Sequence, residues 1–311
     1  YKDLTMKIGL HDAEKEYFKK GKRFPNYALM KISAWHKAQG DQVEWWKPLY
    51  EYDLVYSSKV FDFTPDNPYL PDDTIRGGTG YRDISINKEL LPEIDNMFPD
   101  YSIYPECDYA IGYLTRGCPN NCRWCVVPRK EGQIRAYRTW RDLVRKDTDK
   151  LILMDNNILA CEYGIEQLKS LIGSGYQIDL NQGIDARLVT GQVADILSRL
   201  SWIRFIRFSC DQKSQIVPVR RTVNFLIERG VKPYRIFIYL LVTADIEDAS
   251  ERIEALKGYK AINIYAQAER NERMGITPNA GQLEFQQRYV YSGCYRTETW
   301  QEYCARRGFK Y

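Results

Sequence analysis

From about Tyr109 onward, short apolar runs alternate with longer stretches in which apolar residues recur every three to four positions. The short runs predict β-strands, and the longer stretches predict amphipathic helices between them. Strands are expected at 110–114, 151–154, 178–181, 204–209, 235–242 and 261–265, and helices at 139–146, 164–172, 191–200, 218–229 and 246–256. Strands that alternate with crossover helices predict a parallel sheet. Active sites of such sheets lie at the carboxyl ends of the strands.

The region before this series shows a shorter alternation of the same kind. Its expected elements are a strand at 6–10, a helix at 27–39 that ends before Gly40, and strands at 43–46 and 54–56. Pro, Gly and Asp are frequent between residues 65 and 80, so a loop is expected there. The pattern predicts a small Rossmann-like α/β domain.

The last part of the chain, residues 279–311, predicts two short helices with aromatic faces, whose side chains could cap a substrate opening. The expected fold class is α/β. The expected domains are a Rossmann-like domain at 6–100, a larger α/β domain at 105–275 and a helical C-terminal extension at 279–311.

Composition narrows the class of protein. The chain has 311 residues, of which 44% are hydrophobic, and this is enough to bury a sizeable core. No run of about 18 apolar residues predicts a membrane span, and no apolar segment near the first residues predicts secretion. Five of the eight cysteines are scattered, unlike a secreted disulfide framework. We therefore expect a cytoplasmic protein with no membrane partner.

Three cysteines are clustered, at Cys118, Cys122 and Cys125, just after the expected strand 110–114. Thiolates are the usual ligands of iron–sulfur clusters. A cubane cluster has four irons, so three cysteines leave one iron open to another ligand. Gly117 and the Pro-Asn-Asn stretch after Cys118 favour the turns that a short loop needs to surround a cluster.

A zinc site is the main alternative for these cysteines. Structural zinc usually has four ligands, often in paired C-x2-C units. Only one such pair exists here, and the two histidines, His11 and His36, are distant in sequence. The pattern favours an iron–sulfur cluster, and a zinc-bound nucleic-acid-binding module stays the alternative.

The spacing C-x3-C-x2-C, with Trp124 before the last cysteine, resembles the radical-SAM superfamily. The resemblance covers roughly residues 105–275 and implies a partial (β/α)6 barrel. It also implies a [4Fe–4S] cluster that reductively cleaves S-adenosylmethionine to a 5′-deoxyadenosyl radical, which abstracts hydrogen from a substrate that the sequence does not identify. The implied partner is an electron donor such as flavodoxin or ferredoxin.

The resemblance also suggests cofactor-binding positions, which are the side chains that follow the later strands. These are Asp155, Asn156, Asn157, Gln182, Asp185, Arg187, Ser209, Asp211 and Tyr265. The segment 155–157 stands where the family binds the amino group of the cofactor, although its sequence departs from the family's usual Gly-Gly-Glu. Asn181, Asp185 and Arg187 are expected to face the barrel interior, residues 209–211 the ribose or carboxylate, and Tyr265 the adenine. Ordinary capping or turn residues are the alternative for the polar side chains, because Asp, Asn and Ser favour such positions.

The first domain resembles the cobalamin-binding type that precedes many radical-SAM barrels. The cobalamin-ligating pattern Asp-x-His-x-x-Gly is absent, so bound cobalamin is not favoured, and a cobalamin-dependent methyltransferase is kept as an alternative. A methylthio-transferring enzyme would need three more cluster cysteines in this domain, and residues 6–106 contain none.

Net charge is +4, which by itself does not indicate nucleic-acid binding. Arginines are frequent in the later half of the chain, which makes a nucleic-acid substrate one hypothesis. Solvated helix faces with acidic neighbours are the alternative. The arginines concerned include Arg204, Arg207, Arg220, Arg221, Arg229, Arg235, Arg306 and Arg307.

Overall fold

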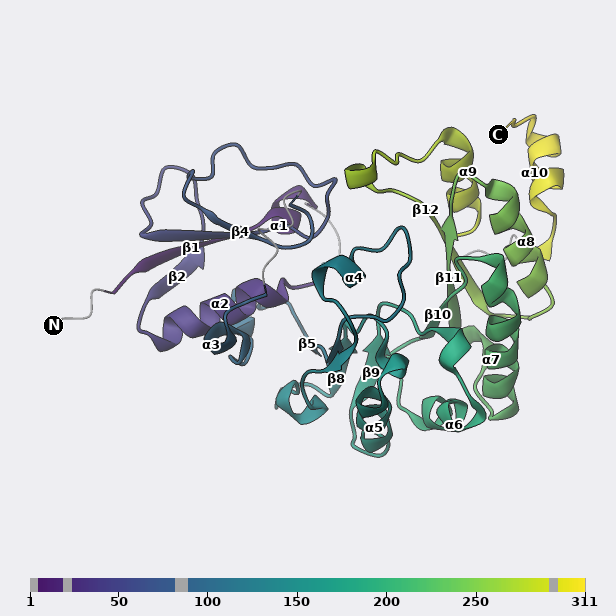
Figure 1. Ribbon diagram of the computed structural model, residues 1–311, viewed down its shortest axis with the longest axis horizontal. Coiled ribbons are helices and arrows are strands. Elements are labelled where there is room, and N and C mark those ends of the chain that lie inside the picture. The colour runs from purple at the N-terminus through teal and green to yellow at the C-terminus, as the bar shows by residue number, and fades with distance from the viewer. Residues whose placement is uncertain (1–4, 19–23, 82–88, 291–295, 311) are drawn as a thin grey trace. The chain divides into compact units, whose positions relative to one another are not determined.

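A computed structural model describes residues 5–18, 24–81, 89–290 and 296–310 (Figure 1). The chain forms two compact units, Tyr1–Asp108 and Tyr109–Tyr311. Both are mixed α/β structures in which most neighbouring strands run parallel. No helix in the described parts of the chain is both long and apolar enough to cross a bilayer.

The first unit is built on a four-stranded parallel sheet in the order β2-β1-β3-β4. Its strands are β1 (Lys7–Asp12), β2 (Gln42–Trp45), β3 (Leu54–Ser58) and β4 (Ile75–Gly77), and its helices are α1 (Ala13–Tyr17), α2 (Tyr27–Ala38) and α3 (Pro92–Asp95). The side chain of Asn26 caps α2, and Gly40 follows it in a left-handed conformation. The predicted strands and long helix are confirmed.

Strand β4 was not expected, because it lies in the stretch that Pro, Gly and Asp mark as a loop. Tyr56 of β3 pairs with Ile75 of β4. The prediction was wrong for these three residues because hydrogen bonding to the edge of the sheet outweighs their weak local preference for a strand.

In the second unit, six parallel strands follow one another in the order of the chain. One sheet contains β5 (Ala110–Gly112), β8 (Lys150–Leu153) and β9 (Gln177–Leu180), and the other contains β10 (Ile206–Ser209), β11 (Ile236–Val242) and β12 (Asn263–Ala268). Parallel bridges from Ile178 to Trp202 and from Ile184 to Phe208 connect the two sheets. The six predicted strands are confirmed, and the carboxyl ends of neighbouring strands therefore meet along one edge.

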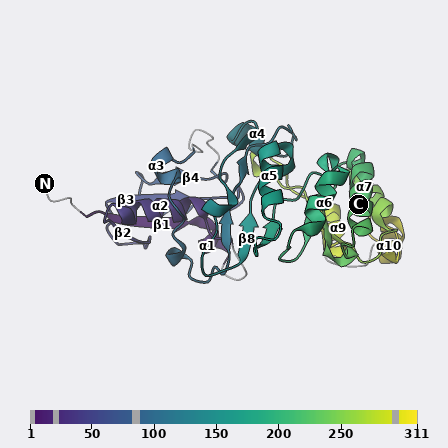
Figure 2. The same ribbon diagram turned by 90° about the horizontal axis from the view of Figure 1, so that it is seen from below.

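The crossover helices are α5 (Glu162–Ser170), α6 (Gly191–Arg199), α7 (Ile216–Glu228) and α8 (Ile246–Leu256). Each packs against the next, and α5, α6 and α7 follow one another in Figure 2. The helix predicted at 139–146 is wrong, because only a 3-10 turn, Trp140–Asp142, forms there. The Arg145 guanidinium bonds Asp147 and the carbonyl of Tyr109, which fixes the chain outside a helix.

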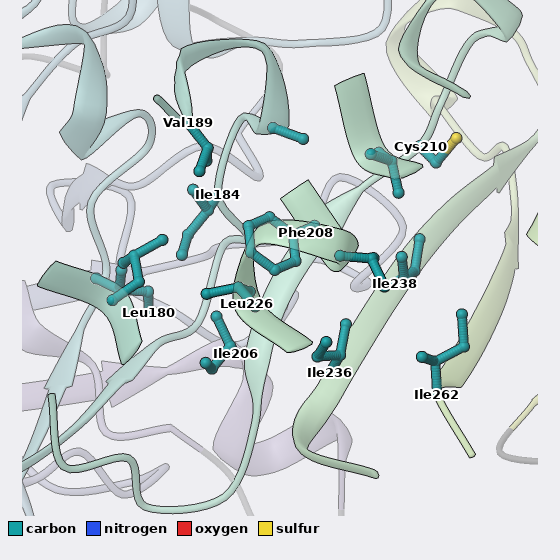
Figure 3. Close-up of a cluster of buried hydrophobic side chains, with 14 of the residues drawn as sticks. Leu180, Ile184, Val189, Ile206, Phe208, Cys210, Leu226, Ile236, Ile238 and Ile262 are labelled. Carbon is teal, nitrogen blue, oxygen red and sulfur yellow. The ribbon is translucent and has the colours of Figure 1, made fainter. Parts of the chain in front are cut away.

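The core lies between these helices and one face of the strands. Alternate residues of β11, including Ile236 and Ile238, are fully buried and lie near Phe208 and Leu226 (Figure 3). The other face of β11 is aromatic, because the ring of Tyr239 stands 5.0 Å from that of Phe237.

The C-terminal segment forms the two predicted helices, α9 (Ala280–Arg288) and α10 (Trp300–Arg307). Tyr289 and Trp300 are buried in the core, and Gln282 donates to the carbonyl of Val242. Tyr289 and Trp300 therefore pack into the core, and the prediction that these two residues cap an opening is wrong.

Candidate metal centre

The cysteine loop begins and ends in a short antiparallel pair, β6 (Thr115–Arg116) with β7 (Arg135–Ala136). The amide of Cys118 donates to the carbonyl of Gly132 at 3.1 Å. Gly117 has φ +84°, and a Cβ at this position would lie 2.2 Å from the carbonyl oxygen of Gln133. Only glycine fits here, so the residue before the first cysteine sets how tightly the loop closes.

Glu131 holds the start of the loop, and its side chain is 8% exposed. Its carboxylate accepts from the amide of Gly117 at 3.0 Å and from Asn156 Nδ2 at 3.0 Å, and it pairs with Arg116 at 2.9 Å. Asn156 is therefore brought to the loop as a support. Sequence reasoning missed Glu131, whose only signal was a single carboxylate among basic residues.

The three clustered thiols are all partly buried. Burial raises the pKa of the Cys122 thiol, the neighbouring Cys125 and Cys118 raise it further, and the positive charge of Arg187 lowers it. Burial likewise raises the pKa of Cys125. These mutual effects place the thiols near one another, with a cation beside them that favours thiolates.

Among the described residues, no three His, Cys, Asp or Glu side chains converge closely enough to hold one metal ion. The donor set present in this loop is three cysteine thiols, and thiolates are the usual ligands of iron–sulfur clusters.

Asp185 and Arg187 lie beside the cysteine loop. Asn120, between the first two cysteines, donates to Asp185 at 3.1 Å, and two nitrogens of Arg187 bond the same carboxylate at 2.8 and 2.6 Å. Burial alone would raise the pKa of Asp185, but the hydrogen bonds from Arg187 and Asn120 outweigh it and leave that pKa below its ordinary value. Gln182 is exposed, and none of these contacts involves it.

Asp155 is placed at the carboxyl end of β8 but turns toward β5. It is fully buried and accepts from the amides of Leu114 and Thr115 and from the Thr115 hydroxyl. Burial raises the pKa of Asp155 to about 6, against the opposing effect of these donors. Its contacts give it a structural role at the end of β5, and they do not favour the expected role in binding an ammonium group.

Asn157 lies next to Cys118 and is 4% exposed. Its Nδ2 donates to the sulfur of Cys118 at 3.7 Å. Its Oδ1 is buried and has no hydrogen-bond partner among the described residues. A buried amide oxygen without a partner is costly, so this atom is available to a bound group.

Asp211 and Ser209 follow β10. Asp211 accepts from the amide of Leu241 at 3.0 Å, and its charge contributes to the raised pKa of Cys122, which places it near the loop. Burial raises the pKa of Asp211, while bonds from Leu241 and Ser209 oppose the shift. The ring of Tyr265 stands 6.0 Å from that of Tyr239 on the aromatic face of the sheet. Their expected contacts with cofactor stay predictions.

Glu269, directly after β12, is a second residue that sequence reasoning missed. It is 4% exposed, and its Oε2 lies 3.7 Å from Arg123 of the cysteine loop. Its Oε1 is buried without a partner among the described residues. Only its place after the sixth strand could have suggested it.

Comparison with known proteins gives one distant relative. No family model matches the chain. The tRNA-2-methylthio-N(6)-dimethylallyladenosine synthase of Aquifex aeolicus (strain VF5) is 29% identical over 157 residues, which cover 47% of this chain. The match spans 35% of that relative, so the chain corresponds to about a third of its length. That relative belongs to the radical-SAM superfamily, and the similarity supports a radical-SAM enzyme, a class that generally uses a [4Fe–4S] cluster and S-adenosylmethionine.

Proposed function

We propose that this chain binds a [4Fe–4S] cluster through Cys118, Cys122 and Cys125 and cleaves S-adenosylmethionine reductively. The observation that carries the proposal is the loop itself. Three neighbouring thiols follow the end of a parallel strand, near a cationic Arg187 and an amide oxygen of Asn157 that has no partner among the described residues. Both are groups that an amino-acid-bearing cofactor would need.

Bound together, the cluster and S-adenosylmethionine would supply a 5′-deoxyadenosyl radical that abstracts hydrogen from substrate. The residues of this chain would bind and orient the cluster and S-adenosylmethionine. We assign Asn157 Oδ1 as an acceptor for the cofactor's ammonium, in place of Asp155, whose oxygens already accept from Leu114 and Thr115. We assign Arg187, fixed by Asp185, to the cofactor's carboxylate. Tyr265 is proposed to contact the adenine.

A nitrogen ligand for cobalamin or zinc would have to come from His11 or His36, the two histidines of the chain. His11 bonds Ser57 through Nδ1 and Glu16 through Nε2, both at 2.8 Å. His36 bonds Asp41 and Tyr56 in the same way. Both nitrogens of each ring are therefore engaged, which argues against either histidine as a ligand of cobalamin or zinc.

For the substrate, we propose transfer RNA as the first class to test, because the Aquifex relative is named for a modified tRNA adenosine. The arginines that suggested nucleic acid are largely engaged within the protein. Arg207 bonds Asp179, Arg229 bonds Asp195 and Arg235 bonds the carbonyl of Trp202.

A flavodoxin or ferredoxin is the proposed electron donor.

The test is anaerobic reconstitution with iron and sulfide, followed by reduction in the presence of S-adenosylmethionine. We expect about four irons and four sulfides per chain, a paramagnetic signal that changes with S-adenosylmethionine, and formation of 5′-deoxyadenosine. Cys118→Ala should abolish all three. Cys161→Ala is the matched control, because Cys161 is also partly buried but lies outside the loop. Bound zinc without sulfide would refute the proposal.

A further inference from the structure

We propose that Asn157 donates a hydrogen bond to the Cys118 thiolate of the bound cluster and so raises its reduction potential. The inference rests on the proposed function, since it needs the cluster. Its evidence is separate: Asn157 Nδ2 lies 3.7 Å from Cys118 Sγ, and the side chain is almost fully buried. Hydrogen bonds to cluster sulfurs tune reduction potentials.

The chain around Asn157 holds the amide in place. Its backbone carbonyl accepts from Ala160 at 3.0 Å, which closes the 3-10 turn Ile158–Ala160. Helix α5 packs tightly on this turn at Gly164, where a Cβ would lie 2.3 Å from the carbonyl oxygen of Ile158. Asn157 therefore has little freedom to turn away from Cys118.

The chemistry of the ligand fixes which end of the amide faces the sulfur. A thiolate bound to iron can only accept, so the NH2 group must face it and Oδ1 must point elsewhere. The donated proton stabilises the more negative, reduced cluster more than the oxidised one, because the attraction grows with the charge on sulfur. Removing the donor should therefore make reduction harder.

The experiment compares midpoint potentials of the reconstituted wild type, Asn157→Leu and Asn157→Asp, followed by electron paramagnetic resonance during anaerobic redox titration. Leu keeps the shape of Asn without its polar atoms, and Asp replaces the donor by an acceptor. Asn181→Leu is the control, because Asn181 lies at the end of the neighbouring strand β9 and bonds Met154 instead of a cysteine. We expect the Asn157 variants to lower the equilibrium constant for reduction about tenfold, which is about 59 mV for one electron.

A second readout uses the wild type alone. With 15N in the asparagine side-chain amides, pulsed paramagnetic resonance of the reduced cluster should show a nitrogen coupling. An absent coupling would overturn the inference even if the variants lose their cluster. A midpoint potential of Asn157→Leu equal to that of the wild type would also overturn the inference. If the wild type itself binds no cluster, the proposed function fails, which is a different result.

Discussion

Gly117→Ala should open the cysteine loop, and the chain contains a matched control for it. Gly117 and Gly132 both have left-handed φ angles, +84° and +71°, so alanine is strained at either position. They differ in their surroundings. A Cβ on Gly132 meets nothing within 4 Å, whereas a Cβ on Gly117 lies 2.2 Å from the oxygen and 2.7 Å from the carbon of the Gln133 carbonyl.

The magnitude follows from that difference. A left-handed alanine costs about 1–2 kcal/mol, which is the whole expected effect of Gly132→Ala. In Gly117→Ala the obstacle is backbone, so the strands must separate by roughly an ångström. The loop then loses the bond from Cys118 to Gly132 and the bond from residue 117 to the buried Glu131 carboxylate. The first bond contributes about 1 kcal/mol and the second about 1.5–3 kcal/mol, so with the backbone strain we expect a total of about 3.5–6 kcal/mol.

The assay is urea unfolding of the cluster-free variants under reducing conditions, followed by iron and sulfide analysis after reconstitution. Gly132→Ala should unfold at slightly lower urea and retain its cluster. Gly117→Ala should be several kcal/mol less stable and retain little iron. Equal free energies of unfolding for the two variants would refute the reasoning, because they would show that the close approach to Gln133 does not set the loop.

Three further outcomes follow from single buried groups. Glu131→Ala should lower the free energy of unfolding by about 2–4 kcal/mol and impair cluster retention, since it removes the buried partner of Arg116. Glu166→Ala, on the exposed face of α5, should change that free energy by less than about 0.5 kcal/mol. Urea unfolding of the two variants is the measurement. Burial raises the pKa of Asp155 from 3.8 to about 6, so its contribution to stability is present below about pH 4 and lost as the pH rises through 6. Relative to Asp155→Asn, the wild type should lose about 3 kcal/mol between about pH 4 and 7, and parallel profiles would contradict this. Arg252→Met should cost about 3–5 kcal/mol in thermal or urea unfolding, because the fully buried guanidinium of Arg252 bonds two strand-end carbonyls and Asp248.

The six strands of the second unit could be predicted because each is an apolar run between amphipathic helices. Elements that depend on distant partners could not. Strand β4 exists through its pairing with β3, and the segment after Trp140 leaves the helical path because Arg145 finds its partners elsewhere. Neither cause is visible in local sequence, since both need the neighbouring chain to be in place.

The candidate metal centre could be located from the sequence to a similar extent. The spacing of Cys118, Cys122 and Cys125 lies within one loop and can be seen directly in the sequence. The structure also brings Asp185 and Arg187 to this loop, through Asn120 and the charge acting on Cys122. The sequence does not show in which direction each side chain points, because a polar side chain after a strand can turn toward the site or back to the backbone.

Whether a polar side chain faces the site or binds the backbone is indicated better by its unpaired hydrogen-bonding atoms than by its residue type. Asp155 and Glu131 have carboxylates that accept from surrounding donors, and those donors belong to the frame of the loop. Asn157 and Glu269 are as buried as Asp155, yet each keeps one oxygen without a partner among the described residues. Leaving a buried acceptor unpaired costs about 1–3 kcal/mol. Asn157 Oδ1 and Glu269 Oε1 are therefore the buried acceptors near the cysteine loop to which a bound group or an ordered water would donate.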